Sequence, residues 1–400
     1  MNRVFAGQPM PQTMVSSIFL AGPSPRDNTT LDWRHEALAY LDVHFDGTVF
    51  IPIPEHRFHG GDGDSAEWTY DGQIDWECQA RAMADIILFW VPRDIAGKMP
   101  AFTTNVEFGE DLHSGKIVYG RPPQAEKNRY LDLRIRELGL PVWDTLSATL
   151  GDAIQTVREG ALRIAGETQV PLFIWRTEAF QGWYESLKAA GNRLDGAKLL
   201  HHAPLVGKVW CFTLATDIWI AAEGRNKSNE FIVSRPDTGA VVAYYQEDEM
   251  TLDASIVLVK EFRSAVNNAE GYVIELPGGS HAEPPVGADG LPILGAEGAL
   301  INAQTELLEE TGIFIEDPHR FEFVEDRQLL STLTTHRTKL YAVRLRKAEY
   351  EQALANAQQK SLHGVESDGE RTQVVVAKRS EVMSLGVDFS TLGMIASVFV

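Results

Sequence analysis

The sequence predicts an α/β protein with two kinds of sheet, a parallel one in the N-terminal part and an α+β sandwich in the C-terminal part. Two observations lead to this fold class. Continuous apolar strands alternate with helices early in the chain, which is typical of a parallel sheet covered on both faces. From Val209 onward the pattern becomes rich in strands, which favours an α+β arrangement.

The N-terminal elements follow one another as strand, helix, strand. Strands are predicted where apolar residues run without interruption, and helices where the apolar pattern is amphipathic. The predicted strands are residues 17–21, 48–52, 85–91 and 117–119, and the predicted helices are residues 31–42, 75–83, 105–114 and 149–164. We expect these elements to form a first domain over residues 1–165.

The remainder divides into a bridge and a second domain. Residues 166–203 are predicted to be a linker whose aromatic side chains, including Trp175, Phe180 and Trp183, pack between the domains. The second domain is predicted over residues 204–400. Its expected strands are residues 210–214, 230–234, 241–245, 256–262, 272–275, 339–345 and 373–376.

The composition limits the classes of partner that the protein is expected to bind. The formal net charge is −20, so the surface repels nucleic acid and long DNA or RNA is not expected as a partner. No apolar run approaches the roughly 20 residues that span a bilayer, and the N-terminus lacks a secretory signal. The two cysteines, Cys78 and Cys211, lie far apart and imply neither a disulfide framework nor a metal site. We therefore expect a cytoplasmic protein without membrane contact.

The most informative stretch is an acidic helix near the C-terminus. Glu306, Glu309 and Glu310 are spaced three and four residues apart, which stacks their carboxylates on one helical face. A hard divalent cation, Mg²⁺ or Mn²⁺, would neutralise them, because carboxylate oxygens are its preferred ligands. The alternative is a solvated acidic face, which is what a charge run usually is.

This stretch resembles the Nudix box, with Glu297, Glu306, Leu307, Glu309, Glu310, Gly312 and Ile313 on motif positions. Two positions depart from the box: Leu291 stands at the glycine position, after an insertion of roughly residues 280–294, and Thr305 replaces the arginine. The resemblance implies a Nudix sandwich, metal binding by Glu306, Glu309 and Glu310, and catalysis through Glu309. A backbone carbonyl near Gly278 would complete the metal site. Loss of the arginine puts full catalytic strength in doubt.

Further residues resemble the ADP-ribose pyrophosphatase branch of that family. Arg263 matches an arginine that contacts substrate there, and guanidinium suits phosphate recognition. Its alternative is an ordinary surface arginine on a strand. Glu366 or Glu370, in a late acidic loop, is the candidate for one more metal ligand. A solvated loop explains these two glutamates equally well.

A second constellation lies in the first domain. Ligands bind parallel α/β sheets at the carboxyl ends of the strands. The turn at Gly22, Glu77 and Glu107 all fall near such ends. A carboxylate near a helix N-terminus is held ionised and could attack an anomeric carbon, while a second carboxyl hands a proton to the leaving base. A simple helix-start carboxylate is the alternative for Glu107.

These residues resemble the nucleoside 2-deoxyribosyltransferase superfamily over roughly residues 15–135. The segments that carry the resemblance are residues 18–23, Glu77, residues 84–85, residues 89–93 and residues 100–109. The resemblance implies a Rossmann- or flavodoxin-like domain with Glu107 as nucleophile and Glu77 as the residue that binds or protonates the base. The superfamily's further aspartate falls on Ala101, which weakens transfer relative to hydrolysis.

The substrate-binding candidates in this domain are Gly22, Ser24, Arg26 and Asn105, with Ser24 and Arg26 suited to a 5′-phosphate or to an ordinary turn. Together the two constellations predict a bifunctional enzyme acting on small nucleotides, with a metal-dependent hydrolase fused to an N-glycosidic domain. The alternative is a nucleotide sensor that binds without turnover. Both resembled families form dimers, so a homodimer is expected by analogy.

Overall fold

The computed structural model describes residues 1–26, 30–60, 69–95, 99–205, 208–248, 253–280, 285–287, 290–291, 293, 295–365 and 369–399. The chain forms two compact units, Met1–Ile232 (unit 1) and Val233–Val400 (unit 2). The sequence had placed the start of the second domain at residue 204, whereas this division assigns the following strands, up to residue 232, to unit 1.

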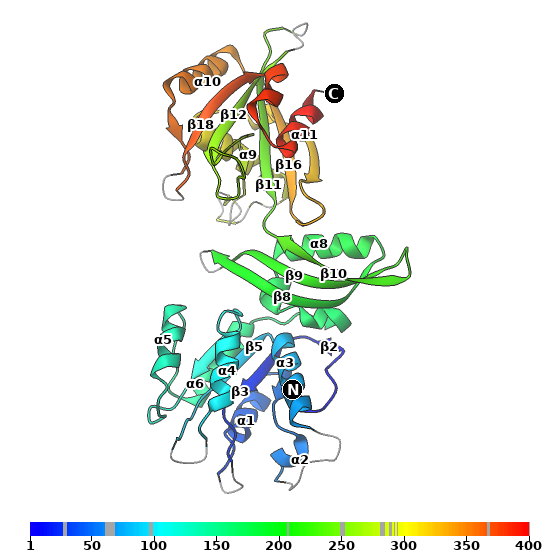
Figure 1. The fold of residues 1–400 in the computed structure, drawn as a ribbon, viewed down its shortest axis with the longest axis vertical. Helices are drawn as coiled ribbons and strands as arrows, with labels where there is room; N and C mark the ends of the chain where they lie inside the picture. Colours follow the sequence, from blue (N-terminus) through cyan, green and yellow to red (C-terminus); the bar gives the residue numbers. More distant parts are fainter. Residues whose placement is uncertain are drawn as a thin grey trace. The chain divides into compact units, whose positions relative to one another are not determined.

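A five-stranded parallel sheet forms the centre of the N-terminal α/β domain, as predicted (Figure 1). Its strands lie in the order β1-β4-β3-β5-β6. Their bounds are Asn2–Phe5 for β1, Thr48–Ile51 for β4, Ser17–Ala21 for β3, Ile86–Trp90 for β5 and Ile117–Gly120 for β6. Chain order reverses between β3 and β5, so the switch point of a doubly wound sheet lies at their carboxyl ends.

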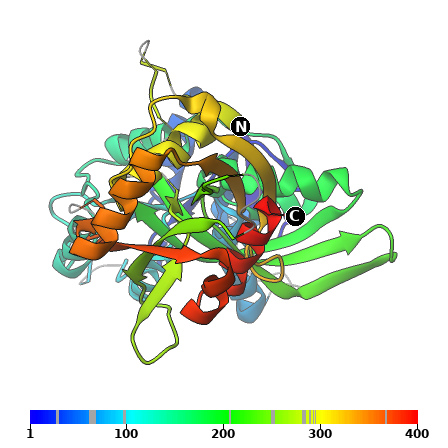
Figure 2. The ribbon, with the colours of Figure 1, turned by 90° about the horizontal axis from the view of Figure 1, so that it is seen from above.

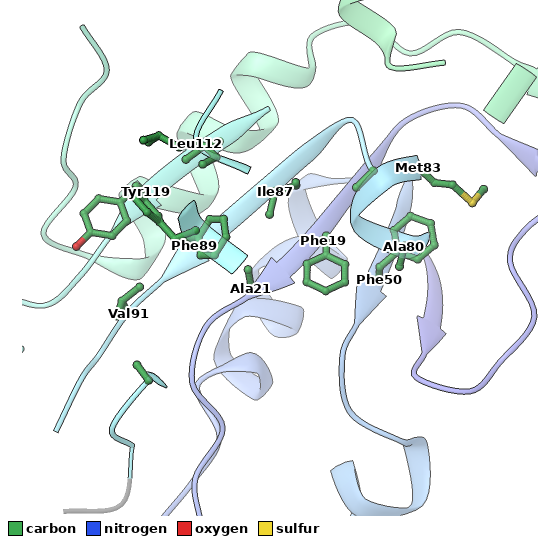
Figure 3. Close-up of a cluster of buried hydrophobic side chains, with 14 of the residues drawn as sticks. Phe19, Ala21, Phe50, Ala80, Met83, Ile87, Phe89, Val91, Leu112 and Tyr119 are labelled. Atoms are coloured by element: carbon green, nitrogen blue, oxygen red, sulfur yellow. The ribbon is translucent and has the colours of Figure 1, made fainter. Parts of the chain in front are cut away.

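Helices cover both faces of this sheet. One face packs against α1 (Arg34–His44) and α6 (Leu146–Val157). The other packs against α3 (Tyr70–Met83), α4 (Phe102–Asp111) and α5 (Arg129–Glu137), and Figure 3 shows part of this second core. Because both faces are covered, every residue of β3, β4, β5 and β6 is buried rather than every second one, whereas the edge strand β1 begins with the exposed Asn2 and Arg3. A short helix, α2, occupies Glu55–Phe58.

All four predicted helices of this domain differ in extent from the observed ones: α1 and α3 span Arg34–His44 and Tyr70–Met83 rather than residues 31–42 and 75–83. Helix α4 begins at Phe102, three residues before the predicted start, directly after Ala101 in the left-handed conformation (φ 58°). Helix α6 ends at Val157 rather than at residue 164. The chain then forms β7 (Arg163–Ile164), which pairs with β2 (Thr13–Met14).

The segment predicted as a linker has its own core. Helices α7 (Leu172–Trp175) and α8 (Glu178–Ala189) follow the 3₁₀ turn Ala165–Gln169. They pack on an antiparallel sheet of β8 (Arg193–Leu205), β9 (Lys208–Ile220) and β10 (Arg225–Ser234). The predicted aromatic residues belong to this cluster, where Trp175 and Trp183 surround the fully buried Phe180.

A buried ion pair ties this segment to the α/β domain. Asp85, at the start of β5, accepts hydrogen bonds of 2.8 and 2.6 Å from the guanidinium of Arg163. The same carboxylate accepts from the backbone N–H of Leu172 at 2.9 Å and from the hydroxyl of Ser17 at 2.9 Å. Asp85 therefore has a structural role, consistent with its position at a strand start.

Unit 2 is built on a mixed sheet of order β15-β16-β11-β12-β18-β17, with β13 beside β12 and β14 beside β11. The strands are β11 (Thr238–Tyr245), β12 (Ser255–Phe262), β13 (Tyr272–Glu275), β14 (Gly278–Gly279), β15 (Glu322–Gln328), β16 (Arg337–Arg344), β17 (Leu362–His363) and β18 (Thr372–Lys378). Helices α9 (Gly295–Thr311) and α10 (Lys347–Gln359) cover one face, and α11 (Phe389–Val398) covers the other (Figures 1 and 2).

No helix within the described ranges combines the length and apolar character needed to cross a bilayer.

Candidate functional sites

The switch point of the parallel sheet is shaped by Gly22. Ala21 and Phe89, at the ends of β3 and β5, are register partners, and the chain leaves β3 at Gly22 with φ of +147°. A Cβ on this glycine would lie 2.1 Å from the carbonyl oxygen of Trp90. Glycine is required here because the two strand ends approach too closely for a side chain.

A cleft of about 390 Å³ lies between α3 and α4 of the α/β domain. Its lining residues are Ile74, Glu77, Cys78, Arg81, Phe102, Thr103, Val106, Glu107 and Glu110. The two glutamates singled out from the sequence thus lie in one cavity, although they are thirty residues apart. Apolar and acidic side chains share this cavity, which is a suitable environment for a small polar ligand with a flat apolar part.

Glu77 and Glu107 line the same cleft, and each affects the pKa of the other. Burial raises the pKa of Glu77 above 4.5, against the opposing effect of a 2.8 Å hydrogen bond from Gln73. Burial, and then the charge of Glu77, raise the pKa of Glu107 from 4.5 to about 7. The two groups therefore titrate together, and both hold their protons to higher pH than a free glutamate does.

Two arginines partly oppose this rise in the pKa values of Glu77 and Glu107. Arg81 and Arg34 both lower the pKa of each carboxyl through their charges. Arg81 is itself held by Asp111 at 2.6 Å and by Glu110 at 2.8 Å. Because Arg81 is already paired with these two carboxylates, acidic groups outweigh basic ones in the cleft lining.

Glu107 is not near a helix N-terminus, which corrects the dipole argument made from the sequence. It is the sixth residue of α4, because that helix begins at Phe102. The helix dipole acts mainly within the first turn, so it does not hold this carboxylate ionised. Burial beside a second carboxyl has the opposite effect and favours the protonated form.

The other predicted substrate-binding residues of this domain lie outside the cleft lining. Ser24 is exposed and accepts a 3.2 Å hydrogen bond from Arg34, and Arg26 is exposed. Asn105 accepts a hydrogen bond from the buried Arg93, on a side of α4 that does not face the cleft. The structure thus brings together the two predicted catalytic residues but not these three.

Sequence reasoning missed the groups that surround the carboxyl pair. Gln73 lies four residues before Glu77 on α3, so its helical spacing was visible in the sequence. Arg81 follows Glu77 at the same spacing. Arg34 comes from α1, and no local pattern linked it to either glutamate.

In unit 2, two predicted metal ligands face the glycine pair of β14. Glu310 is buried and accepts a 2.8 Å hydrogen bond from the N–H of Gly278. A Cβ on Gly279 would lie 2.2 Å from Oε1 of Glu306. The glycines therefore let the carboxylates of α9 approach the backbone of β14.

Repulsion among carboxyl groups marks this cluster. Burial, then the charges of Glu370 and Glu309, raise the pKa of Glu306 to about 7. Burial and the charge of Glu306 raise the pKa of Glu310 well above 4.5. Arg263 opposes the effect at Glu306, and its guanidinium ion-pairs with Glu275 at 2.9 Å and Glu261 at 2.8 Å.

The donor chemistry of this cluster suits a hard divalent cation, since carboxylate oxygens are the ligands that such a cation prefers. Within the described part of the chain, however, no three His, Cys, Asp or Glu side chains are arranged to hold one ion. Glu366, the predicted late ligand, lies outside the described residues. Thr305, at the position of the box arginine, donates a 2.9 Å hydrogen bond to the Ile301 carbonyl of its own helix.

Comparison with known families bears on unit 1. Residues 15–125 match the family described as nucleoside 2-deoxyribosyltransferase like, and the matched stretch contains both Glu77 and Glu107. The N-terminal domain is therefore nucleoside 2-deoxyribosyltransferase-like. The match ends before unit 2 begins and gives no support to the Nudix resemblance. No curated protein matches the chain.

Proposed function

We propose that the N-terminal domain cleaves or exchanges the N-glycosidic bond of a nucleoside or nucleotide. The observation that carries this proposal is that Glu77 and Glu107 line one cleft between α3 and α4 and titrate together. Glycoside chemistry uses two carboxyl groups in different protonation states, and two carboxyl groups whose titrations are linked can supply both.

In this proposal Glu107 in its ionised form attacks the anomeric carbon of the sugar. Glu77 delivers its proton to the leaving base, whose departure needs neutralisation of the developing negative charge. The glycosyl group then rests on Glu107 as an ester until water or a second base displaces it. The apolar side chains of Ile74, Phe102 and Val106 line the same cleft and offer a surface for the base.

The test is incubation of the full chain with a panel of nucleosides and nucleoside monophosphates, with free base identified by mass. We expect base release from at least one member, and a loss of at least about 1,000-fold in Glu107→Gln. Glu137→Gln, which alters an exposed carboxylate on α5, is the matched control. Tight calorimetric binding of a panel member without product would instead identify a sensor.

We propose as a second function that unit 2 hydrolyses a nucleoside diphosphate linked to another group, with ADP-ribose first among the candidates. It is favoured by Glu306 and Glu310 lying against the glycine pair of β14. Glu306, Glu309 and Glu310 would hold Mg²⁺ or Mn²⁺, which when bound would neutralise the diphosphate and activate water. Arg263, which ion-pairs with Glu261 and Glu275, would contribute a guanidinium for recognition of the substrate phosphates.

This second proposal is tested separately with ADP-ribose and related dinucleotides in the presence of Mg²⁺ or Mn²⁺. Product formation that Glu310→Gln reduces by about 100-fold or more would support it. Metal binding by the intact chain, measured by calorimetry in wild type and Glu310→Gln, gives a readout independent of turnover. Equal binding by both proteins together with no product would refute the assignment.

A further inference from the structure

Gln73, on helix α3, connects one of the two cleft glutamates to the central sheet. Its side-chain amide nitrogen, Nε2, donates to Oε1 of Glu77 at 2.8 Å and to the backbone carbonyl of Pro52 at 3.3 Å. Pro52 directly follows β4, so this carbonyl lies at the carboxyl end of a sheet strand. Gln73 and Glu77 are four residues apart and share one face of the helix. The Glu77 carboxyl is therefore fixed both to its own helix and to the end of β4.

These two contacts determine how the amide of Gln73 is oriented. A backbone carbonyl can only accept, so the NH2 group of Gln73, and not its oxygen, must face Pro52. The same nitrogen lies at Oε1 of Glu77. Oε1 is therefore an acceptor whether Glu77 is ionised or protonated, since an amide NH2 group only donates. When Glu77 holds a proton, that proton consequently lies on Oε2.

We propose that Gln73 is a positioning residue for the N-glycosidic reaction: it places the proton of Glu77 on Oε2 and holds this carboxyl in the cleft for transfer of that proton to the leaving base. The inference rests on the proposed function of the N-terminal domain and adds a residue outside the cleft lining. Gln73 touches no reacting atom in this proposal and acts through Glu77.

Departure of the base changes the hydrogen bond between Gln73 and Glu77. As the glycosidic C–N bond breaks, its electron pair goes to the base, the anomeric carbon bonds to Glu107, and the proton on Oε2 of Glu77 moves to the base. Glu77 is left as a carboxylate, which accepts a stronger hydrogen bond than a protonated carboxyl does. The contact from Gln73 thus strengthens as the proton leaves, which favours the transition state over the bound substrate.

Other groups around Glu77 stay in place when Gln73 is replaced. Burial raises the pKa of Glu77, and the hydrogen bond from Gln73 opposes this rise. Arg34 on α1, Arg81 on α3 and Glu107 on α4 oppose it as well. Removing the bond from Gln73 alone should therefore raise the pKa of Glu77 further.

The experiment compares Gln73→Met and Gln73→Glu with wild type on two kinds of substrate. Methionine has a similar length but no donor, and glutamate has the same shape but no NH2 group. The base of a nucleoside needs a proton on departure, whereas p-nitrophenolate, leaving a p-nitrophenyl glycoside of the same sugar, is a stable anion. We expect both variants to lose about 30-fold or more in kcat/KM on a nucleoside that wild type cleaves, and less than about threefold on the p-nitrophenyl glycoside. Gln79→Met, which replaces an exposed glutamine of the same helix, should leave both rates unchanged.

The pH dependence gives a second readout that a merely structural role would not move. The descending limb of kcat/KM on the nucleoside reports loss of the acid's proton in the free enzyme. In Gln73→Met this limb should move upward by about half a pH unit or more, because a hydrogen bond that favours the carboxylate is gone. Equal losses on both substrates together with an unmoved limb would overturn the proposal.

NMR of the Gln73 side-chain amide tests the contact without turnover. In wild type the amide signal should follow the titration of Glu77, and in Glu77→Gln this response should be lost. An amide signal that does not respond to pH in wild type would also overturn the proposal, even if neither variant at position 73 folds. Absence of base release by wild type from every substrate would refute the proposed function instead, and the amide titration would still decide whether Gln73 holds the Glu77 carboxyl.

Discussion

Glu107→Gln should stabilise the protein at alkaline pH while removing its proposed activity. Glu107 is buried beside Glu77, and its pKa is raised from 4.5 to about 7. At pH 8 the folded protein must therefore hold an ionised carboxylate in an unfavourable place. Glutamine has nearly the same shape and carries no charge, so it can hydrogen-bond to Glu77 without this cost.

The size of the effect follows from the pKa. Each unit corresponds to about 1.4 kcal/mol, so ionising Glu107 at pH 8 costs the folded state roughly 3 kcal/mol. Part of this cost belongs to Glu77, because the two groups titrate together, so we expect a gain of about 1–3 kcal/mol. The folded carboxyl keeps its proton to higher pH than the unfolded one. Stability is therefore fully present below pH 4.5 and is lost as pH rises through about 7.

Urea denaturation at about pH 5 and about pH 8 measures this gain. Hydrogen exchange of α3 and α4 peptides assigns the transition to unit 1, since a chain of two units need not unfold in one step. Glu137→Gln, on the exposed face of α5, should change stability by no more than about 0.5 kcal/mol at either pH.

The difference in stability between Glu107→Gln and wild type should depend on pH. Glu107→Gln should have almost the wild-type stability at about pH 5 and exceed it at about pH 8. An equal effect at both pH values, or a loss of more than about 1 kcal/mol at the higher one, would mean that burial of the Glu107 carboxyl does not oppose its ionisation.

Three further substitutions test other parts of the structure. Arg163→Met should destabilise unit 1 by about 3–5 kcal/mol in denaturant titrations, because it leaves the buried carboxylate of Asp85 without its cation; an effect below about 1 kcal/mol would contradict this. Gly279→Ala should reduce metal binding measured by calorimetry at least about tenfold, because its Cβ would lie 2.2 Å from Glu306 Oε1; unchanged binding and melting would argue against the proposed metal role of Glu306. Gly182→Ala, in α8 with no atom within 4 Å of its Cβ, should raise stability by about 0.5–1 kcal/mol, and a loss of stability would show that this helix position is strained.

Elements defined by local pattern were predicted closely. Strand β3 and strand β13 have the predicted bounds, Ser17–Ala21 and Tyr272–Glu275. In β3 every residue is buried, and the apolar run stops at Gly22, so strand and turn signals coincide. Such elements need no knowledge of distant residues.

The start of α4 was predicted three residues too late, at Asn105. The observed helix begins at Phe102 after Ala101, which adopts a left-handed conformation uncommon for alanine. Tertiary packing decides the start, since Thr104 and Phe108 must face the sheet together.

Contacts between distant segments could not be read from the sequence. Strand β8 was predicted as linker, since its long pairing with β9 appears only in the fold. Arg34 lies in a helix predicted only as amphipathic, and the fold encloses it almost completely. Its partners lie on the strand and loop before it, and its effect on Glu77 crosses from α1 to α3.

The two acidic clusters show why glutamates brought together by a fold can favour either proton transfer or cation binding. In the first, the titrations of Glu77 and Glu107 are linked, and the charges of Arg34 and Arg81 favour ionisation of both carboxyls. In the second, the charge of Glu306 raises the pKa of Glu310, the charges of Glu370 and Glu309 raise that of Glu306, and the nearby Arg263 is ion-paired with Glu261 and Glu275. A cluster of the first kind favours proton transfer, and one of the second kind favours an external cation. The distinction depends on which cations the fold delivers to each site, which spacing along a helix does not reveal.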